Sequence, residues 1–363
     1  MKKIAVFFGG ESVEHDVSVI TGVLTLNALK KSSYLPIPVY VDFKGEWWSG
    51  ESLFEVESFK NLNFKKLKKV LVYPGDNGLF ILKKNKLKRI DSISCAINCM
   101  HGGDGENGSL AGALNLSFIP LTSANVLGSS IAMDKVLSKT FLKGLGVKTV
   151  NGLKISALKE LEERTIDFPV IVKPSTLGSS IGISVCNDDE ELKRGVLLAL
   201  RYSESVLIEN YVENALEINC AAYLSEKGVV VSECEKPAGA GKILSFEDKY
   251  LTGEREFPAN IPQKKSDKIK SITKKVYLAL NLTGFVRIDF LLNEQGDIYL
   301  NEINTVPGSL AYYLFTPTLE GFSKILEEQI RLSESKFSSK KTLLTKYKSA
   351  IFSMSGTKGA KHL

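Results

Sequence analysis

Residues 284–308 read GFVRIDFLLNEQGDIYLNEINTVPG, a pattern that predicts two strands joined by a turn. Successive side chains in a strand point to opposite faces, so Arg287 and Asp289 share one face of the first strand. Glu302 and Asn304 share one face of the second strand for the same reason. If the two strands pair, Asp289, Glu302 and Asn304 converge on one spot.

The residue types at that spot favour a magnesium site. Three oxygen ligands beside an arginine, without histidine or thiol, suit Mg²⁺ that holds a polyphosphate. The alternative is a surface hairpin with polar residues on its solvated face. Two features argue against that alternative: the strands are otherwise strongly apolar, and Pro307-Gly308 imposes a fixed turn directly after the ligands.

The composition is typical of a soluble globular protein. A chain of 363 residues allows two or three domains, and 44% hydrophobic with 24% charged residues is ordinary. The net charge of +6 comes from 47 Lys+Arg against 41 Asp+Glu. The lysine-dense segments 64–69 and 83–89 lack interleaved aromatic residues, so they indicate a solvated face and no nucleic-acid partner.

The cysteines and the N-terminus predict a cytoplasmic location. No CxxC motif occurs, and an odd number of cysteines within apolar runs indicates buried free thiols in a reducing compartment. The N-terminal apolar run is too short for a signal peptide, and no stretch approaches the ~20 apolar residues of a membrane span. We therefore expect no membrane partner. The cysteines are Cys95, Cys99, Cys186, Cys220 and Cys234.

The N-terminal segment alternates predicted strands and helices. Such βαβ order implies a parallel sheet, whose ligands bind at the carboxyl ends of the strands. Glycine-rich loops at 9–10 and 102–108 follow two of these strands. The predicted strands are 4–8, 36–41, 93–100 and 118–121, and the first helix carries Val17, Ile20, Leu24 and Ala28 on one face.

Two further segments mix strands and helices. The second has predicted strands 169–174, 183–186 and 205–209, a helix around 133–135, and a helix to Arg201 capped near Asp188. The third has strands 217–224 and 229–235, a long polar loop at 236–260, a helix over 266–280, and the hairpin described above. After residue 334 the chain is polar and rich in Ser and Lys.

The loop Gly178-Ser179-Ser180-Ile-Gly182 between two predicted strands indicates phosphate binding. Small residues let backbone N–H groups and hydroxyls close over phosphate oxygens. The alternative is an ordinary hairpin turn. Lys173 at a strand end and Lys135 near a helix start can supply cations, and no GxxxxGK[ST] pattern occurs.

Other candidate contacts are less specific. The motif Gly103-x-Gly105-x-x-Gly108 fits a dinucleotide-binding loop, but the acid expected about 20 residues later is missing. Residues 209–212 can offer backbone groups to an adenine edge, with Glu217 near the ribose, although each of these acids taken alone is more often a surface residue. His101 is either a substrate contact or a capping residue.

Taken together, these motifs resemble the D-alanine–D-alanine ligases of the ATP-grasp superfamily. The resemblance is in order along the chain and covers residues 3–330. It is carried by the following motifs: Gly9-Gly10-x-Ser12-x-Glu14, His101-Gly-x-x-Gly-Glu106-Asn-Gly108, Met133-Asp-Lys135, Val172-Lys173-Pro-Ser, Gly178-Ser179-Ser180-x-Gly182, Lys249-Tyr250, Arg287-x-Asp289 and Asn301-Glu302-x-Asn304-Thr-x-Pro307-Gly308.

The resemblance implies an α/β (α+β) ATP-grasp fold with four parts. Residues 1–125 would form an N-terminal substrate-binding βαβ domain. Residues 126–213 and 214–334 would form a central and a C-terminal ATP-grasp subdomain that sandwich ATP, and residues 335–363 would be a polar tail. It also implies joining of two D-alanines through D-alanyl phosphate for peptidoglycan synthesis, with a homodimer as one option.

The resemblance further implies residue roles on the ATP side. Asp289, Glu302 and Asn304 would hold two Mg²⁺ ions, with Mn²⁺ as a possible substitute. The remaining ATP contacts would be phosphate groups, adenine and ribose. Lys135, Lys173 and Lys249 would contact the phosphates, together with the loop that bears Ser180. Glu209, Asn210 and Val212 would frame adenine, and Glu217 would contact the ribose.

On the substrate side, the resemblance implies that Glu14 takes the ammonium of the first D-alanine. Arg287 and the Gly308 N–H would stabilise the tetrahedral oxyanion. Ser179 and Tyr250, linked to Glu14, would close the loop, and the Tyr250 hydroxyl would favour an amine over a hydroxy acid as acceptor.

One departure from the family concerns the acceptor. The family has a small hydroxyl residue five positions past the glycine of Pro307-Gly308, whereas this chain has Tyr313. We expect the acceptor carboxylate to meet Tyr313, Arg287 and the Gly308 and Leu314 N–H groups, or Tyr313 simply to pack. The alternatives in function are D-lactate or D-serine as acceptor, a nucleotide-dependent oxidoreductase, and a nucleotide-binding module without activity.

Overall fold

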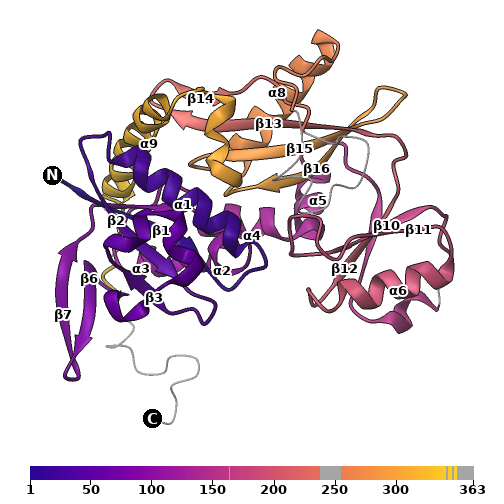
Figure 1. The fold of residues 1–363 in the computed structure, drawn as a ribbon. Helices are drawn as coiled ribbons and strands as arrows, with labels where there is room; N and C mark the ends of the chain where they lie inside the picture. The colour runs from indigo at the N-terminus through magenta and orange to yellow at the C-terminus, as the bar shows by residue number, and fades with distance from the viewer. Residues whose placement is uncertain (163, 238–254, 341, 346, 350–363) are drawn as a thin grey trace.

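The structure, a computed structural model, describes residues 1–162, 164–237, 255–340, 342–345 and 347–349. Three larger sheets and one smaller sheet are arranged as shown in Figure 1, with the N-terminal part and the β10–β12 sheet at opposite ends of the molecule. In the described part of the chain, no helix is long and apolar enough to cross a membrane.

The N-terminal sheet confirms the predicted βαβ organisation. Strand β1 (Lys3–Gly9) pairs in parallel with β2 (Leu35–Val41) and with β8 (Cys95–Asn98). Its order is β4-β3-β2-β1-β8, with α1 (His15–Leu29) in the crossover and β3 (Trp47–Ser49) and β4 (Lys68–Lys69) antiparallel at one edge.

Two N-terminal expectations need correction, and one sheet was missed. Residues 118–121 are not a strand, although Leu121 forms a parallel bridge with Ala96. Ile20 is 52% exposed, because α1 buries Val19, Val23 and Leu26 against the core. An antiparallel sheet that the sequence analysis missed consists of β5 (Leu71–Tyr73), β6 (Asp76–Lys83) and β7 (Lys86–Ser92).

The second sheet confirms the central strands. Its order is β11-β10-β12-β9, from β9 (Gly152–Ile155), β10 (Val170–Pro174), β11 (Ser184–Cys186) and β12 (Val206–Asn210). Helix α6 (Asp189–Ala199) covers it and begins, as predicted, at an aspartate cap, since Asp188 accepts from the Glu191 N–H. The helix predicted around 133–135 is two helices, α4 (Val126–Met133) and α5 (Lys135–Gly144), because Asp134 caps α5.

The third sheet contains the hairpin. Its order is β14-β13-β15-β16, from β13 (Leu216–Ser225), β14 (Gly228–Val231), β15 (Val286–Leu292) and β16 (Ile298–Asn304). Helix α8 (Gln263–Ala279) packs on it through Ile269 and Val276, as the spacing predicts. The other helices are α2 (Gly103–Glu106), α3 (Ser109–Leu116), α9 (Leu319–Lys340) and the 3₁₀ segments η1 (Glu51–Phe54), η2 (Val56–Asn61), η3 (Phe64–Lys66), η4 (Leu158–Leu161) and η5 (Gly308–Leu314).

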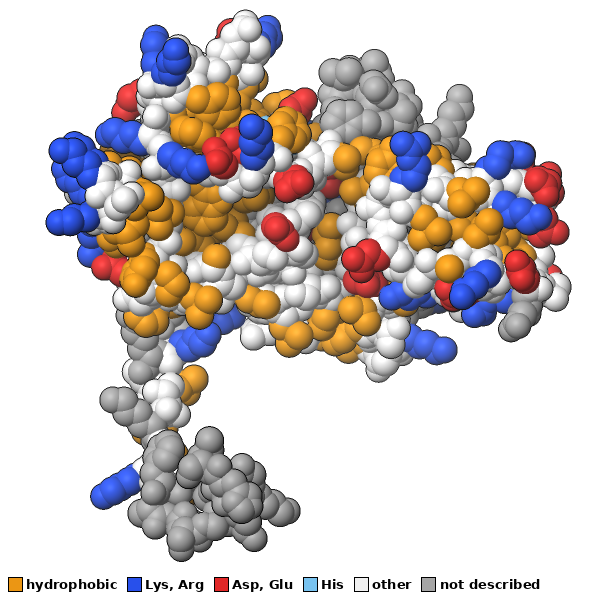
Figure 2. All heavy atoms as spheres, turned by 90° about the horizontal axis from the view of Figure 1, so that it is seen from below, with side chains coloured by type: hydrophobic (Ala, Val, Ile, Leu, Met, Phe, Trp, Pro, Cys, Tyr) orange, Lys and Arg blue, Asp and Glu red, His pale blue; other side chains and the backbone are white. Residues whose placement is uncertain are grey.

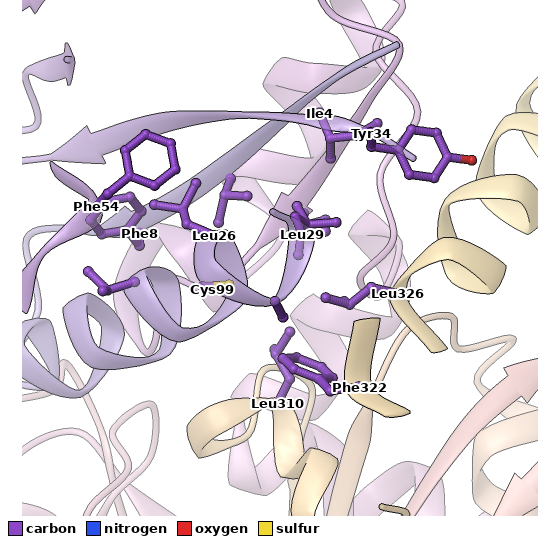
Figure 3. Packing of buried hydrophobic residues seen from close by; sticks show 14 of the residues in the cluster. Ile4, Phe8, Leu26, Leu29, Tyr34, Phe54, Cys99, Leu310, Phe322 and Leu326 are labelled. Atoms are coloured by element: carbon purple, nitrogen blue, oxygen red, sulfur yellow. The ribbon is translucent and has the colours of Figure 1, made fainter. Parts of the chain in front are cut away.

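The hydrophobic clusters cross the predicted segment boundaries. Phe322 and Leu326 of α9 pack against α1 and β1 of the N-terminal sheet, as Figure 3 shows. Ala132 of α4 and Leu142 of α5 pack with the third sheet rather than the second. Helix α9 also continues past residue 334 to Lys340, so the predicted tail begins inside a helix. The domain boundaries therefore stay a prediction.

The five cysteines are buried free thiols, as predicted. On the face shown in Figure 2, Lys and Arg side chains lie at several separate places among hydrophobic and acidic ones. That distribution fits the prediction of a solvated charged surface.

Candidate functional site

The hairpin brings the predicted metal ligands together. Strands β15 and β16 are antiparallel, with Asp289 opposite Glu302 and Arg287 opposite Asn304. The Asn304 Nδ2 donates to Asp289 Oδ2 at 3.0 Å. Directly opposed residues in a sheet share a face, so the predicted convergence is confirmed.

A bulge places one further polar residue at the site. The register shifts between Asp289 and Phe290, so Asn301 is an extra residue on β16 and points to the same side as Glu302. Asn301 Oδ1 accepts from Lys173 Nζ at 3.0 Å. Glu302 Oε1 accepts from Lys135 Nζ at 2.9 Å. The sequence analysis gave Asn301 no role.

Positive charges balance the carboxylates. Arg287 donates from Nε and Nη2 to the two oxygens of Asp289, at 2.7 and 2.9 Å. Such a fork is a strong, geometrically specific pairing, and it fixes the guanidinium over the sheet. Arg287 is therefore held beside the predicted metal ligands, where developing negative charge on a substrate would meet it.

The donor set fits a magnesium ion bound largely by its substrate. Mg²⁺ in phosphate-handling sites uses one or two carboxylates and takes its other ligands from phosphates and water. Asp289 and Glu302 supply two carboxylates side by side, and Asn304 supplies an amide. Among the described residues, no group of three or more His, Cys, Asp or Glu could hold a metal by itself.

A cavity lies between this face of the sheet and the N-terminal part of the chain. Glu14 lies at the start of α1, at the carboxyl end of β1, as the topology predicts. The Ser179 hydroxyl donates to the Glu14 carboxylate and so joins the Gly178–Gly182 loop to the N-terminal domain. Nine predicted site residues line the cavity. Five of them are predicted catalytic or substrate residues, Glu14, His101, Ser179, Arg287 and Gly308, and the other four are Lys135, Asp289, Glu302 and Asn304.

His101 is held in a neutral state. It is 4% exposed, and its Nε2 lies 3.0 Å from the Thr21 hydroxyl, which accepts from the Ser309 N–H. Burial, together with the nearby positive charge of Arg287, lowers the pKa of His101 to about 3. The residue thus connects α1 to the segment after Gly308 as well as lining the cavity.

Glu106 is a second residue to which the sequence analysis assigned no role. Its Oε1 accepts from the N–H groups of Thr305 and Val306 at 2.9 and 3.1 Å, and Oε2 accepts from the Gly102 N–H at 3.1 Å. Burial and the nearby charge of Glu14 raise the pKa of Glu106 to about 7. Glu106 therefore fixes the backbone that follows Asn304 against the His101 loop.

A second cavity lies next to the first. The two share Lys135, Leu177, Gly178 and Glu302 in their walls. One wall comes from the second sheet and the other from the third. The second cavity is lined by every predicted nucleotide contact that the structure describes: Lys135, Lys173, Ser180, Glu209, Asn210, Val212 and Glu217.

The prediction for residues 209–212 concerned their backbone groups, and the Glu209 side chain makes contacts that the sequence analysis did not predict. Its carboxylate is almost fully buried and pairs with Lys173 Nζ at 2.7 Å and with Lys139. Burial alone would raise its pKa, but the two lysines outweigh that effect and hold the pKa of Glu209 below its usual value. Its carboxylate therefore holds two lysines at the wall of the second cavity. Lys139 was missed because it lies 70 residues away along the chain.

Two of the predicted acceptor residues, Tyr313 and Leu314, are not in the wall of the first cavity. Leu314 is buried against Ala221 and Ala311, and Tyr313 packs at the edge of that cluster. The ring of Tyr313 lies under the guanidinium of Arg255, 4.4 Å from ring centroid to Cζ. Lys249 and Tyr250 fall outside the described residues.

Two family models match this chain. The model described as "D-ala D-ala ligase N-terminus" matches residues 3–124, and the model described as "D-ala D-ala ligase C-terminus" matches residues 148–322. Together they cover the hairpin and most of the residues that line the two cavities, whereas Ala132, Met133 and Lys135 lie between the two matched ranges.

Individual relatives agree with the family models. The chain is 35% identical to the D-alanine–D-alanine ligase of Thermosipho melanesiensis, covering 94% of this chain and 96% of the relative. The crystal structure of the Helicobacter pylori D-alanine–D-alanine ligase matches with a TM-score of 0.77 at 30% identity, over 91% of this chain and 98% of that one. The Enterococcus faecalis VanG D-Ala:D-Ser ligase matches with a TM-score of 0.76 at 26% identity, over 92% and 99%.

Proposed function

The chain belongs to the D-alanine–D-alanine ligase family, and on that premise we propose that it is an ATP-dependent, ADP-forming ligase that joins two D-alanines for peptidoglycan synthesis. The observation that carries the proposal is the pair of adjoining cavities. One has the lysines and small loop of a polyphosphate site, and the other has an acid, an arginine and a backbone N–H suited to an amino acid.

The proposed chemistry begins with activation of a carboxylate. A carboxylate is a poor electrophile, so its oxygen first attacks the terminal phosphorus of ATP, and ADP leaves. The resulting D-alanyl phosphate has a good leaving group. Phosphoryl transfer needs in-line positioning and charge neutralisation. Lys135 at the junction of the cavities and Lys173 in the second cavity would provide both. Mg²⁺, held by Asp289, Glu302 and Asn304, would neutralise further phosphate charge.

The first D-alanine would bind between two domains. Its ammonium would pair with Glu14, which Ser179 orients. Its carbonyl would lie toward Arg287 and the Gly308 N–H, which stabilise negative charge on oxygen when the second amine attacks and phosphate leaves. Arg287 is preorganised for that task because Asp289 holds two of its nitrogens.

A panel of acceptors tests the proposal. We expect ADP release that requires both Mg²⁺ and D-alanine, with D-alanyl-D-alanine as the product. D-Serine is the second candidate acceptor, because the VanG D-Ala:D-Ser ligase is nearly as similar in structure as the Helicobacter pylori ligase. Release of ADP without dependence on any D-amino acid would contradict the proposal, and D-alanyl-D-serine as the main product would correct the acceptor.

A further inference from the structure

The polar face of the third sheet extends beyond the metal ligands. Asn219 of β13 lies opposite Asp289, and Glu235 forms an antiparallel bridge with Asn219. Opposed residues share a face, so Glu235 and Asn219 continue the row that starts at Glu302 and Asp289. Glu235 is 3% exposed and Asn219 is 6% exposed. The row thus runs from the nucleotide side of the sheet toward β14, past Arg287.

An arginine is fixed at the far end of this row. Arg255 Nη1 donates to Glu235 Oε1 at 3.3 Å. Its guanidinium also stacks on the ring of Tyr313, at the cation–π distance given above. The Arg255 side chain is 46% exposed, whereas its partner carboxylate is buried. A planar cation held on two sides therefore presents its remaining N–H groups to solvent.

Tyr313, whose ring packs against Arg255, belongs to the segment that begins at Gly308. Tyr313 lies in η5, which begins at Gly308, and its neighbour Leu314 packs on Ala221 of β13. Ala221 lies opposite Arg287 in the sheet register. Burial, offset in part by Arg287 and Arg255, raises the pKa of Tyr313 to about 12. The phenol is therefore neutral, and the cluster of Arg255, Glu235 and Tyr313 lies beside Arg287.

In the described part of the chain, two sides of the first cavity are accounted for. Glu14 and Ser179 close it on the N-terminal side, and the nucleotide cavity adjoins it at Lys135 and Glu302. An amine that attacks a carbonyl held at Arg287 and Gly308 can approach along the sheet face from Asn219. Its carboxylate would then extend toward Arg255.

We infer that Arg255, held by Glu235 and the ring of Tyr313, binds the carboxylate of the acceptor amino acid. This inference rests on the proposed function. A zwitterionic acceptor needs a cation for its carboxylate, and a guanidinium offers two parallel N–H groups to it. Arg287 already gives two nitrogens to Asp289, so a second arginine serves the acceptor. Tyr313 acts as a positioning residue through its ring.

The first test separates the acceptor from the donor. Hydroxylamine has no carboxylate, and its nitrogen attacks the acyl phosphate to give a hydroxamate with release of phosphate. We expect Arg255→Gln to raise the KM for the acceptor by about tenfold or more, the effect of a lost charge-assisted hydrogen bond. Hydroxamate formation with D-alanine as donor should stay within about twofold of wild type. Arg255→Lys should fall between the two, since it keeps charge without the fork.

A matched control and two tyrosine variants complete the experiment. Arg331 pairs with Glu226 at 3.3 Å on the surface of α9, so Arg331→Gln should leave both reactions unchanged. Tyr313→Leu should raise the acceptor KM more than Tyr313→Phe, because phenylalanine keeps the aromatic face. Thermal unfolding identifies variants that lose structure. The inference would be overturned if Arg255→Gln left the acceptor KM unchanged. It would also be overturned if the variant lost as much activity with hydroxylamine as with the amino-acid acceptor. A wild-type protein without D-alanine-dependent ADP release would instead overturn the proposed function.

Discussion

Glu302 is placed to act in both cavities. Its carboxylate pairs with Lys135 and lies opposite Asp289. Glu302→Gln keeps the shape of the side chain and removes its charge. We therefore expect turnover to fall by about 100-fold and the Mg²⁺ concentration needed for half-maximal activity to rise, because the metal site is weakened. ADP release at varied Mg²⁺ measures both effects. Glu294→Gln, on the exposed turn of the same hairpin, is the control, and near wild-type turnover in Glu302→Gln would remove the metal assignment.

His101 makes a prediction about pH. An unfolded histidine titrates near 6.5, whereas burial, with Arg287 nearby, lowers the pKa of His101 to about 3 in the folded protein. The unfolded state therefore binds the extra proton first as the pH falls. The contribution of His101 to stability is fully present above pH 6.5 and is lost between 6.5 and 3, by at most about 1.4 kcal/mol per pH unit.

Denaturant unfolding of the ligand-free protein across that range tests the prediction. The free energy of unfolding of wild type should fall more steeply with decreasing pH than that of His101→Gln, and the two slopes should agree above pH 6.5. Parallel slopes below pH 6.5 would show that His101 is not buried in its neutral form.

At the residue scale, the sequence predicted the polar residues that local spacing brings together. Alternation in two adjacent strands was enough to place Asp289, Glu302 and Asn304. It could not supply Lys139 or Glu106, because their partners lie far away in the chain. When two charged residues lie so far apart along the chain, their positions in the sequence do not indicate that they form a pair.

At the element scale, the hairpin was predicted except for its bulge. The buried residues of β16 are Ile298, Leu300 and Ile303, so the regular period of two is interrupted once. That interruption was the available sequence signal. The sheet of β5, β6 and β7 was missed because none of its strands shows a sustained alternation of apolar and polar residues: β5 is three residues long, β6 has its apolar residues in one run, and β7 is mostly polar.

The bulge makes the element-scale prediction. Deleting Asn301 removes the extra residue and leaves the faces on both sides of it unchanged. We expect a protein that still unfolds cooperatively but has a KM for ATP raised by about tenfold, because Lys173 loses the Asn301 oxygen. Asn301→Ala keeps the bulge without that oxygen and should match the deletion in KM. A deletion variant that fails to fold while Asn301→Ala folds would show that the bulge itself is structurally required.

At the scale of the whole molecule, separate cores meet at the cavities. The second sheet has its own hydrophobic cluster, whereas the third sheet packs with α4, α5 and α8. Helix α9 joins the N-terminal sheet to the C-terminal part of the chain. The sequence indicated three segments but not this exchange of helices, since apolar periodicity shows which face is buried and not the partner that buries it.

Binding of a nucleotide between two cores predicts a coupled response. The cavity takes Ile171, Lys173 and Glu209 from one sheet and Leu291, Asn301 and Glu302 from the other, so a non-hydrolysable ATP analogue with Mg²⁺ would contact both. A ligand at 100 times its Kd stabilises the bound state by about 2.7 kcal/mol. We therefore expect amide hydrogen exchange to slow in β10 and β12 and in β15 and β16 together, measured by mass spectrometry.

Two comparisons make that measurement decisive. Strand β1 lies in the N-terminal sheet and has its own core on both faces, so its exchange should change little when the nucleotide analogue is added. Lys173→Met removes a cation that contacts Glu209 of one sheet and Asn301 of the other, and it should reduce protection in both sheets at the same analogue concentration. Protection confined to the second sheet would place the nucleotide on that sheet alone. In that case, Asp289 and Glu302 would not take part in holding its phosphates.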